Sequence, residues 1–193
     1  MQSLNHNIIT SYAKINIGLK ILGILPDGYH SIWTIMHEID LHDTITIYKR
    51  QDNIINLNIS GDIKVPNNTN NLCVKSAELF FDSYNINDIG LDIQLHKNIP
   101  VGAGLGGGSS NAASILLLLK EMFKLDATNQ NLCDIGFKLG CDVPFFIHGG
   151  IQISEGKGEK LSSTSINLDG YTILLVLPNF SVSTKWAYSF FKN

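Results

Sequence analysis

The chain has 193 residues, a formal net charge of −3 and 44% hydrophobic residues. That length and apolar content suit one ordinary globular domain, or one domain and part of a second, with a proper hydrophobic core. The slightly acidic balance gives no reason to expect a nucleic acid as partner, and no apolar run is long enough to span a membrane.

The N-terminus and the cysteines indicate the compartment. Residues 1–19 lack the basic stretch and the apolar core of a secretory signal peptide. Cys73, Cys133 and Cys141 show no paired spacing typical of a zinc site or a disulfide framework. These observations predict a cytoplasmic protein whose thiols are reduced and buried.

The first half of the chain is predicted to form strands and one helix. Residues 8–25 and 32–48 are rich in strand-forming residues, and Pro26-Asp27-Gly28 between them is a strong turn signal. Residues 54–59 alternate apolar and polar side chains, as a half-buried strand does. The apolar positions of residues 71–84 recur with the period of an amphipathic helix.

The second half begins with a strand over 91–97, then a glycine-rich loop and an apolar helix over 112–125. Ser109 or Ser110 is the expected N-cap of that helix. Further along, the sequence predicts a second helix, a buried strand and the start of a last helix, at 129–139, 171–177 and 184–192. This order indicates an α+β fold with mainly antiparallel or mixed strand pairing.

The most informative stretch is the glycine-rich loop, PVGAGLGGGSSNAA at residues 100–113. Glycine lets backbone N–H groups approach an anion without a Cβ in the way. The helix that follows directs the positive end of its dipole, with free N–H groups, into the loop. Together these features predict a phosphate-binding site.

Three kinds of phosphate loop compete for this stretch. No lysine follows the glycines, which excludes a Walker A loop. A dinucleotide fingerprint, G-x-G-x-x-G, matches from Gly102 to Gly107 with Asp126 downstream, although residues 98–100 separate the strand from the glycines. The third kind is the P-x-x-x-G-L-G-S-S-like loop of the GHMP small-molecule kinases, which residues 100–113 resemble closely.

The segment SYAKIN, residues 11–16, places a lysine within a strand. With Ile15 and Ile17 facing the core, Lys14 and Asn16 would share the other face of the strand. Taken by itself, the segment favours a solvated lysine at the edge of the sheet.

Two loops bring an aromatic ring, an imidazole and a carboxylate. PDGYH, residues 26–30, is either a hairpin turn with surface aromatics or a loop that offers a ring and an imidazole to a ligand. In GCDVPFF, residues 140–146, Asp142 follows a helix-ending glycine and precedes an apolar segment. Asp142 is either a general base or an ordinary N-cap or turn aspartate.

In their order and intervals these segments resemble the GHMP kinases, from about residue 11 to the end of the chain. The resemblance implies a GHMP kinase N-terminal domain over residues 1–160, with the ribosomal protein S5 domain 2-like fold. Residues 161–193 would then begin a truncated, ferredoxin-like C-terminal domain. The family usually continues well past this point, so a missing C-terminal half is expected, and the chain alone is expected to be poorly active.

PDGYH and the triple glycine resemble one branch of the family in particular. That branch implies an ATP-dependent kinase for the 2-hydroxyl of 4-diphosphocytidyl-2-C-methyl-D-erythritol, in the non-mevalonate pathway to isoprenoid precursors. Two alternatives stay open within the family: a kinase of another small alcohol, and a truncated nucleotide-binding module with little or no catalysis. A dinucleotide-dependent oxidoreductase is the alternative outside the family. The implied partner is a small molecule, with no nucleic acid and no membrane.

The resemblance also implies catalytic and nucleotide-binding roles. Asp142 would take the proton from the attacking hydroxyl, and the Lys14 cation beside it would keep the aspartate ionised. Mg²⁺ would bridge phosphate oxygens, with Ser110 as a candidate ligand. The expected ATP contacts are Asn71 at the adenine, where a simple N-cap is the alternative, and Pro100, Val101, Gly102, Ala103, Gly104, Leu105, Gly106, Gly107, Gly108, Ser109 and Ser110 at the phosphates.

The same resemblance assigns substrate contacts. Tyr29 would stack on the cytosine, and His30 would read the edge of that base. Asn16 would contact the substrate near Lys14. Thr184 and Tyr188 would lie on the last helix, where Tyr188 is the second stacking aromatic or an ordinary surface tyrosine.

Overall fold

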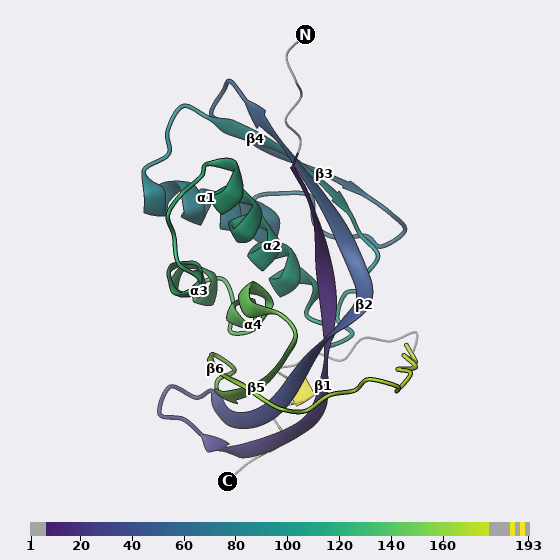
Figure 1. Ribbon diagram of the computed structural model, residues 1–193. Helices are drawn as coiled ribbons and strands as arrows, with labels where there is room; N and C mark the ends of the chain where they lie inside the picture. Colours follow the sequence, from purple (N-terminus) through teal and green to yellow (C-terminus); the bar gives the residue numbers. More distant parts are fainter. Residues whose placement is uncertain (1–6, 178–185, 188–189, 192–193) are drawn as a thin grey trace.

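The computed structural model describes residues 7–177, 186–187 and 190–191. A twisted sheet runs the length of the molecule, and the helices pack against one of its faces (Figure 1). The strands are β1 (Asn7–Ile24), β2 (His30–Arg50), β3 (Ile55–Ser60), β4 (Gly90–His96), β5 (Ile151–Gly156) and β6 (Lys160–Ser163). The helices are α1 (Leu72–Tyr84), α2 (Gly107–Met122), α3 (Asn129–Phe137) and α4 (Val143–His148).

The long strand β2 organises the sheet. One edge of β2 pairs with β1, while the other edge is shared between β4, which pairs with residues 44–50, and β5, which pairs with residues 32–37. All these pairs are antiparallel, and only β3 and β4 pair in parallel within the described sheet. The predicted α+β fold with mixed pairing is therefore confirmed.

The hydrophobic core lies between the sheet and helix α2. Ile115, Leu116 and Leu119 of α2 are fully buried, and they belong to the same apolar cluster as Ile45 and Ile93 of the sheet. Such a helix is apolar on most of its surface because other elements surround it. The apolar run after the glycines thus forms a central helix, as its sequence predicts.

Helix α2 begins earlier than the sequence predicts. Its N-cap is Gly106, in the left-handed conformation with φ 71°, and no side chain caps it. The prediction that Ser109 or Ser110 caps the helix is therefore wrong. The physical reason is that left-handed Gly106 turns the chain into the helix before either serine is reached, while the Ser110 hydroxyl bonds Ser11 instead.

The predicted buried strand over 171–177 is also wrong. These residues belong to no strand of the described sheet, and Leu174 and Val176 are 85% and 80% exposed. An apolar run predicts burial, but a strand also needs a neighbouring edge to take its backbone hydrogen bonds. The helix predicted over 184–192 lies mostly outside the described residues.

Three short elements escaped prediction: α4, β5 and β6. Strand β6 covers residues 160–163 and pairs with β5, so the sheet continues across the expected domain boundary at residue 160. No helix in the described part of the chain is both long enough and apolar enough to cross a membrane.

Candidate functional site

The glycine-rich loop and the first turns of α1 and α2 enclose a pocket of about 360 Å³. Backbone N–H groups at the start of a helix have no partner within the helix, so they are available to an anion. The pocket is therefore suited to phosphate groups. Its lining residues are Val65, Pro66, Asn70, Asn71, Leu72, Leu95, Lys97, Asn111 and every residue from Pro100 to Ser109.

Close packing requires a glycine at the turn into α2. A Cβ added at Gly106 would lie 2.8 Å from the Phe146 ring and 3.1 Å from Lys14 Cγ. The backbone N–H of Lys14 also donates a 2.9 Å hydrogen bond to the Leu105 carbonyl. The loop thus lies directly against the strand that carries Lys14 and the helix that follows Asp142.

Lys14 is buried, contrary to the expectation of a solvated lysine at the sheet edge. Its exposed fraction is 6%, whereas Ile17, expected to face the core, is 41% exposed, and Asn16 is exposed as well. The physical reason is a register shift between Tyr12 and Ala13, which breaks the alternation of β1 so that Ala13 and Lys14 are both buried.

The Lys14 ammonium has two polar neighbours. Its Nζ donates a 2.7 Å hydrogen bond to Asn16 Oδ1 and lies 3.9 Å from Asp142 Oδ2. Burial lowers the pKa of Lys14 below its usual value, while the charge of Asp142 opposes that shift. The group can stabilise negative charge at the site, and it gives up a proton more readily than a surface lysine.

Asp142 stands at the N-cap position of α4, but its side chain makes no capping hydrogen bond. The carboxylate is 36% exposed and lies near Lys14. The β5–β6 turn closes this side of the site, since a methyl group added at Gly158 would lie 3.7 Å from Asp142 Oδ1. Because its side chain is 36% exposed, the Asp142 carboxylate is accessible to a hydroxyl group brought to the site.

A relay of hydrogen bonds behind Lys14 was not predicted. Asn16 Nδ2 donates to Thr34 Oγ1 at 2.8 Å, and the Thr34 hydroxyl donates to the Gly18 carbonyl at 2.7 Å. Thr34 is fully buried. Threonine is common in strands, so no sequence signal indicates that Thr34 belongs to the site. The hydrogen bond to Asn16 connects it with the site.

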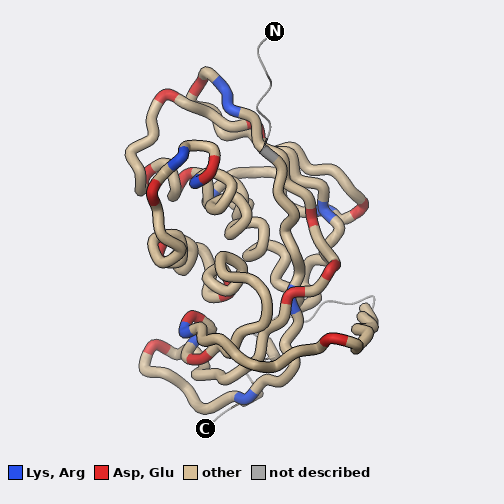
Figure 2. Tube along the Cα trace, viewed as in Figure 1, with Lys and Arg blue, Asp and Glu red and all other residues tan. Residues whose placement is uncertain are grey.

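The PDGYH segment forms the hairpin turn between β1 and β2, so that interpretation is confirmed. Tyr29 is 57% exposed, and its ring centroid lies 4.8 Å from the Lys157 ammonium, which also pairs with Asp27. His30 Nε2 lies 3.2 Å from the Phe191 carbonyl oxygen. Figure 2 shows acidic and basic segments gathered at this end of the molecule, where the PDGYH turn meets the β5–β6 turn.

Two predicted nucleotide or metal contacts have structural roles. Asn71 caps α1, with its Oδ1 accepting from the Cys73 N–H at 2.9 Å, and it also lines the pocket. The cap is confirmed, and the contact with adenine stays a prediction. The Ser110 hydroxyl is buried 2.7 Å from Ser11 Oγ and does not line the pocket. Thr184 and Tyr188 lie outside the described residues.

Residues 71–150 match the family model for the N-terminal domain of GHMP kinases. They form a GHMP kinase N-terminal domain. Among solved structures, a 4-(cytidine 5'-diphospho)-2C-methyl-D-erythritol kinase superposes on 83% of this chain with a TM-score of 0.70 and 32% identity. The mevalonate kinase of Methanococcus jannaschii shares the fold, with a TM-score of 0.64 and 20% identity over 83% of this chain. Each alignment covers 56% of the solved chain.

Two curated relatives of this chain carry the same name. The 4-diphosphocytidyl-2-C-methyl-D-erythritol kinase of Clostridium beijerinckii is 46% identical over 183 residues, which are 95% of this chain and 64% of the relative. The protein of the same name from Clostridium novyi is 44% identical over 178 residues, which are 92% of this chain and 62% of the relative. The chain therefore spans 62–64% of the length of these relatives.

Proposed function

We propose that this chain carries the ATP-binding and phosphoryl-transfer centre of a kinase that acts on 4-diphosphocytidyl-2-C-methyl-D-erythritol, in the non-mevalonate pathway to isoprenoid precursors. The observation that carries the proposal is the meeting of three groups. The glycine-rich loop packs against Lys14, and Lys14 Nζ lies 3.9 Å from the Asp142 carboxylate. The names of the relatives and of the similar solved kinase supply the acceptor.

In the proposed reaction, the free N–H groups of the loop and of α2 bind the phosphates of ATP. Asp142 accepts the proton of the 2-hydroxyl as the hydroxyl oxygen forms a bond to the γ-phosphorus. The bond between that phosphorus and the bridging oxygen breaks, and the electron pair leaves with ADP. Lys14 stabilises the negative charge that gathers near the reacting oxygens.

Mg²⁺ fits this site as a companion of ATP. No group of three or more His, Cys, Asp or Glu side chains that could hold a metal occurs among the described residues. Mg²⁺ commonly binds phosphate oxygens with only one or two protein groups, and it neutralises phosphate charge when bound. Because the Ser110 hydroxyl bonds Ser11, Ser109, which lines the pocket, is the better candidate ligand.

The acceptor would bind on the side of the PDGYH turn. The exposed ring of Tyr29 offers a surface for stacking on cytosine, and His30 beside it offers an imidazole to the edge of the base. Asn16 would contact the acceptor next to Lys14. Thr184 and Tyr188 remain part of this proposal as contacts from the C-terminal side.

A panel of acceptors tests the proposed substrate. ADP release from MgATP would be measured with 4-diphosphocytidyl-2-C-methyl-D-erythritol, mevalonate, homoserine and galactose. We expect the cytidine diphosphate compound to give the fastest release. Faster release with another alcohol would assign the chain to a different branch of the family. ATP binding without release for any acceptor would favour the alternative of a nucleotide-binding module.

A further inference from the structure

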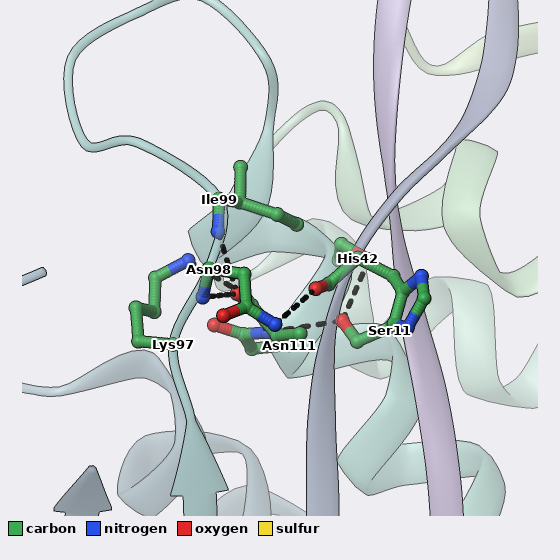
Figure 3. A network of polar contacts seen from close by, with 8 residues as sticks. Ser11, His42, Lys97, Asn98, Ile99 and Asn111 are labelled. Carbon is green, nitrogen blue, oxygen red and sulfur yellow. Dashed lines mark hydrogen bonds and ion pairs between the residues drawn. The ribbon is translucent and has the colours of Figure 1, made fainter. Parts of the chain in front are cut away.

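A fully buried carboxylate lies beneath the glycine-rich loop. Asp43 of β2 accepts hydrogen bonds from the backbone N–H groups of Asn98 and Ile99 on Oδ1, at 2.7 and 2.8 Å. Its Oδ2 accepts from Lys97 Nζ at 2.5 Å and from Asn111 Nδ2 at 2.8 Å. Figure 3 shows Lys97, Asn98 and Ile99 of the segment before the loop close to Asn111 of helix α2.

The donors flank the loop on both sides. Residues 97–99 directly precede Pro100, where the loop begins, and Asn111 lies beyond its glycines, within the first turns of α2. One carboxylate therefore fastens the two ends of the loop to each other. The same carboxylate belongs to the central strand β2, so the base of the loop is anchored to the sheet.

A second layer of contacts ties this network to the strand of Lys14. Ser11 Oγ accepts from Asn111 Nδ2 at 2.9 Å and shares a hydrogen bond with Ser110 Oγ at 2.7 Å. Ser11 stands three residues before Lys14 in β1. These hydrogen bonds therefore connect the end of the loop at α2 with the strand that carries Lys14.

Such a network is costly unless every member is paired. Burying an ionised carboxylate is strongly unfavourable, and here the Lys97 cation and three further donors offset that cost. A buried ion pair is weak evidence for stability, but it can fix one arrangement of the groups around it. A loop held in its binding conformation loses less conformational entropy when a ligand binds.

We propose that Asp43 is a positioning residue of the nucleotide site. By joining both ends of the glycine-rich loop, it holds the phosphate-facing N–H groups in place before ATP arrives. The inference rests on the proposed function for the identity of the ligand. The order of the loop itself can be measured in the free chain.

Hydrogen exchange of the free 193-residue chain tests whether Asp43 orders the glycine-rich loop. Asp43→Asn keeps the size of the side chain but removes its charge, and Asp43→Asn with Lys97→Met avoids leaving Lys97 buried and unpaired. In both variants we expect amides within residues 97–111 to exchange about tenfold faster, while the rest of the chain exchanges as in the wild type. Asp92→Asn, in neighbouring β4, is the matched control, because Asp92 accepts side-chain hydrogen bonds away from the loop.

ATP titration of the same proteins completes the experiment. We expect the dissociation constant to rise about tenfold in the Asp43 variants and to stay unchanged in Asp92→Asn. Wild-type exchange rates over residues 97–111, or faster exchange spread over the whole chain, would overturn the proposal. If the wild type bound no ATP, the proposed function would fail, and the exchange rates would still decide whether Asp43 orders the loop.

Discussion

Lys14 shows how a local irregularity buries a charged side chain at the candidate site. A regular strand would have placed it opposite to Ala13, but the shift in register buries both residues. Burial lowers the pKa of Lys14, and hydrogen bonding to Asn16 fixes the direction of its ammonium group. The position of that ammonium relative to Asp142 thus depends on the register shift in β1 and on the hydrogen bond to Asn16.

Thr34→Val tests this dependence at the level of one hydroxyl. The substitution leaves Asn16 without its partner, so Asn16 and the Lys14 ammonium are held less firmly. We expect the turnover number to fall about tenfold, because small displacements of a catalytic group are costly. The ATP dissociation constant should stay the same, because Thr34 does not line the pocket at the glycine-rich loop.

Thr34→Ser is the matched control, since it keeps the hydroxyl and removes only a methyl group. Its turnover number should return close to that of the wild type. Turnover by Thr34→Val at the wild-type rate would show that the relay has no part in placing Lys14.

At the level of elements, periodicity and turn residues predicted the longer, regular helices and strands. The strands over 54–59 and 91–97 and the helices over 71–84 and 129–139 were found close to their expected positions. The short α4 was not predicted because six residues hold too few periods to recognise, although an N-cap was one of the alternatives for Asp142.

The parts of the site that depend on a local sequence pattern were predictable. The parts that depend on contacts between distant residues were not. The glycine-rich loop was recognisable because its backbone properties follow from its composition. The roles of Thr34 and Asp43 depend on partners many residues away, so no local pattern reveals them. The burial of Lys14 was missed because a bulge cannot be read from alternation.

Gly136→Ala tests the packing of α3 on α4, which places Asp142 at the start of α4. A Cβ at Gly136 would lie 2.6 Å from Val143 Cγ1. We expect a loss of about 1–3 kcal/mol in the free energy of unfolding, measured by urea titration. Gly140→Ala is the control, because its Cβ meets only ordinary contacts of 3.6 and 3.8 Å. Equal stability of the two variants would contradict close packing between α3 and α4.

The contact between Glu38 of β2 and Gly150, just before β5, should make the free energy of unfolding depend on pH. Burial raises the pKa of Glu38 above its usual value, although the Gly150 N–H donates to its carboxylate at 2.7 Å. The folded state therefore holds the Glu38 proton more tightly than the unfolded state. Stability is lost as pH rises from about 4.5 through the folded-state pKa.

Glu38→Gln removes that loss. We expect the variant to unfold at a higher temperature than the wild type at pH 7, with the difference closing as the pH is lowered to about 4. The same substitution at the exposed Glu155 of β5 is the control. A wild-type advantage at pH 7 would show instead that the folded state favours the ionised carboxylate of Glu38.

At the scale of the whole molecule, the sheet brings distant parts of the chain to one place. The glycine-rich loop meets Lys14 of β1 through the Leu105 carbonyl, and Lys14 meets Asp142 at the start of α4. The β5–β6 turn then joins this centre to the PDGYH turn through Lys157. The proposed nucleotide site, the proposed reacting groups and the proposed acceptor side thus follow one another along the sheet (Figure 1).

Phosphorus NMR of a reaction mixture tests most directly whether the proposed centre transfers a phosphoryl group from ATP to the acceptor. With MgATP and 4-diphosphocytidyl-2-C-methyl-D-erythritol, we expect the wild type to produce ADP and a new phosphomonoester resonance. Asp142→Asn should produce neither, while binding ATP within about twofold of the wild-type affinity. A new phosphomonoester formed equally fast by Asp142→Asn, or none from a wild type that binds ATP, would contradict the proposed phosphoryl-transfer centre.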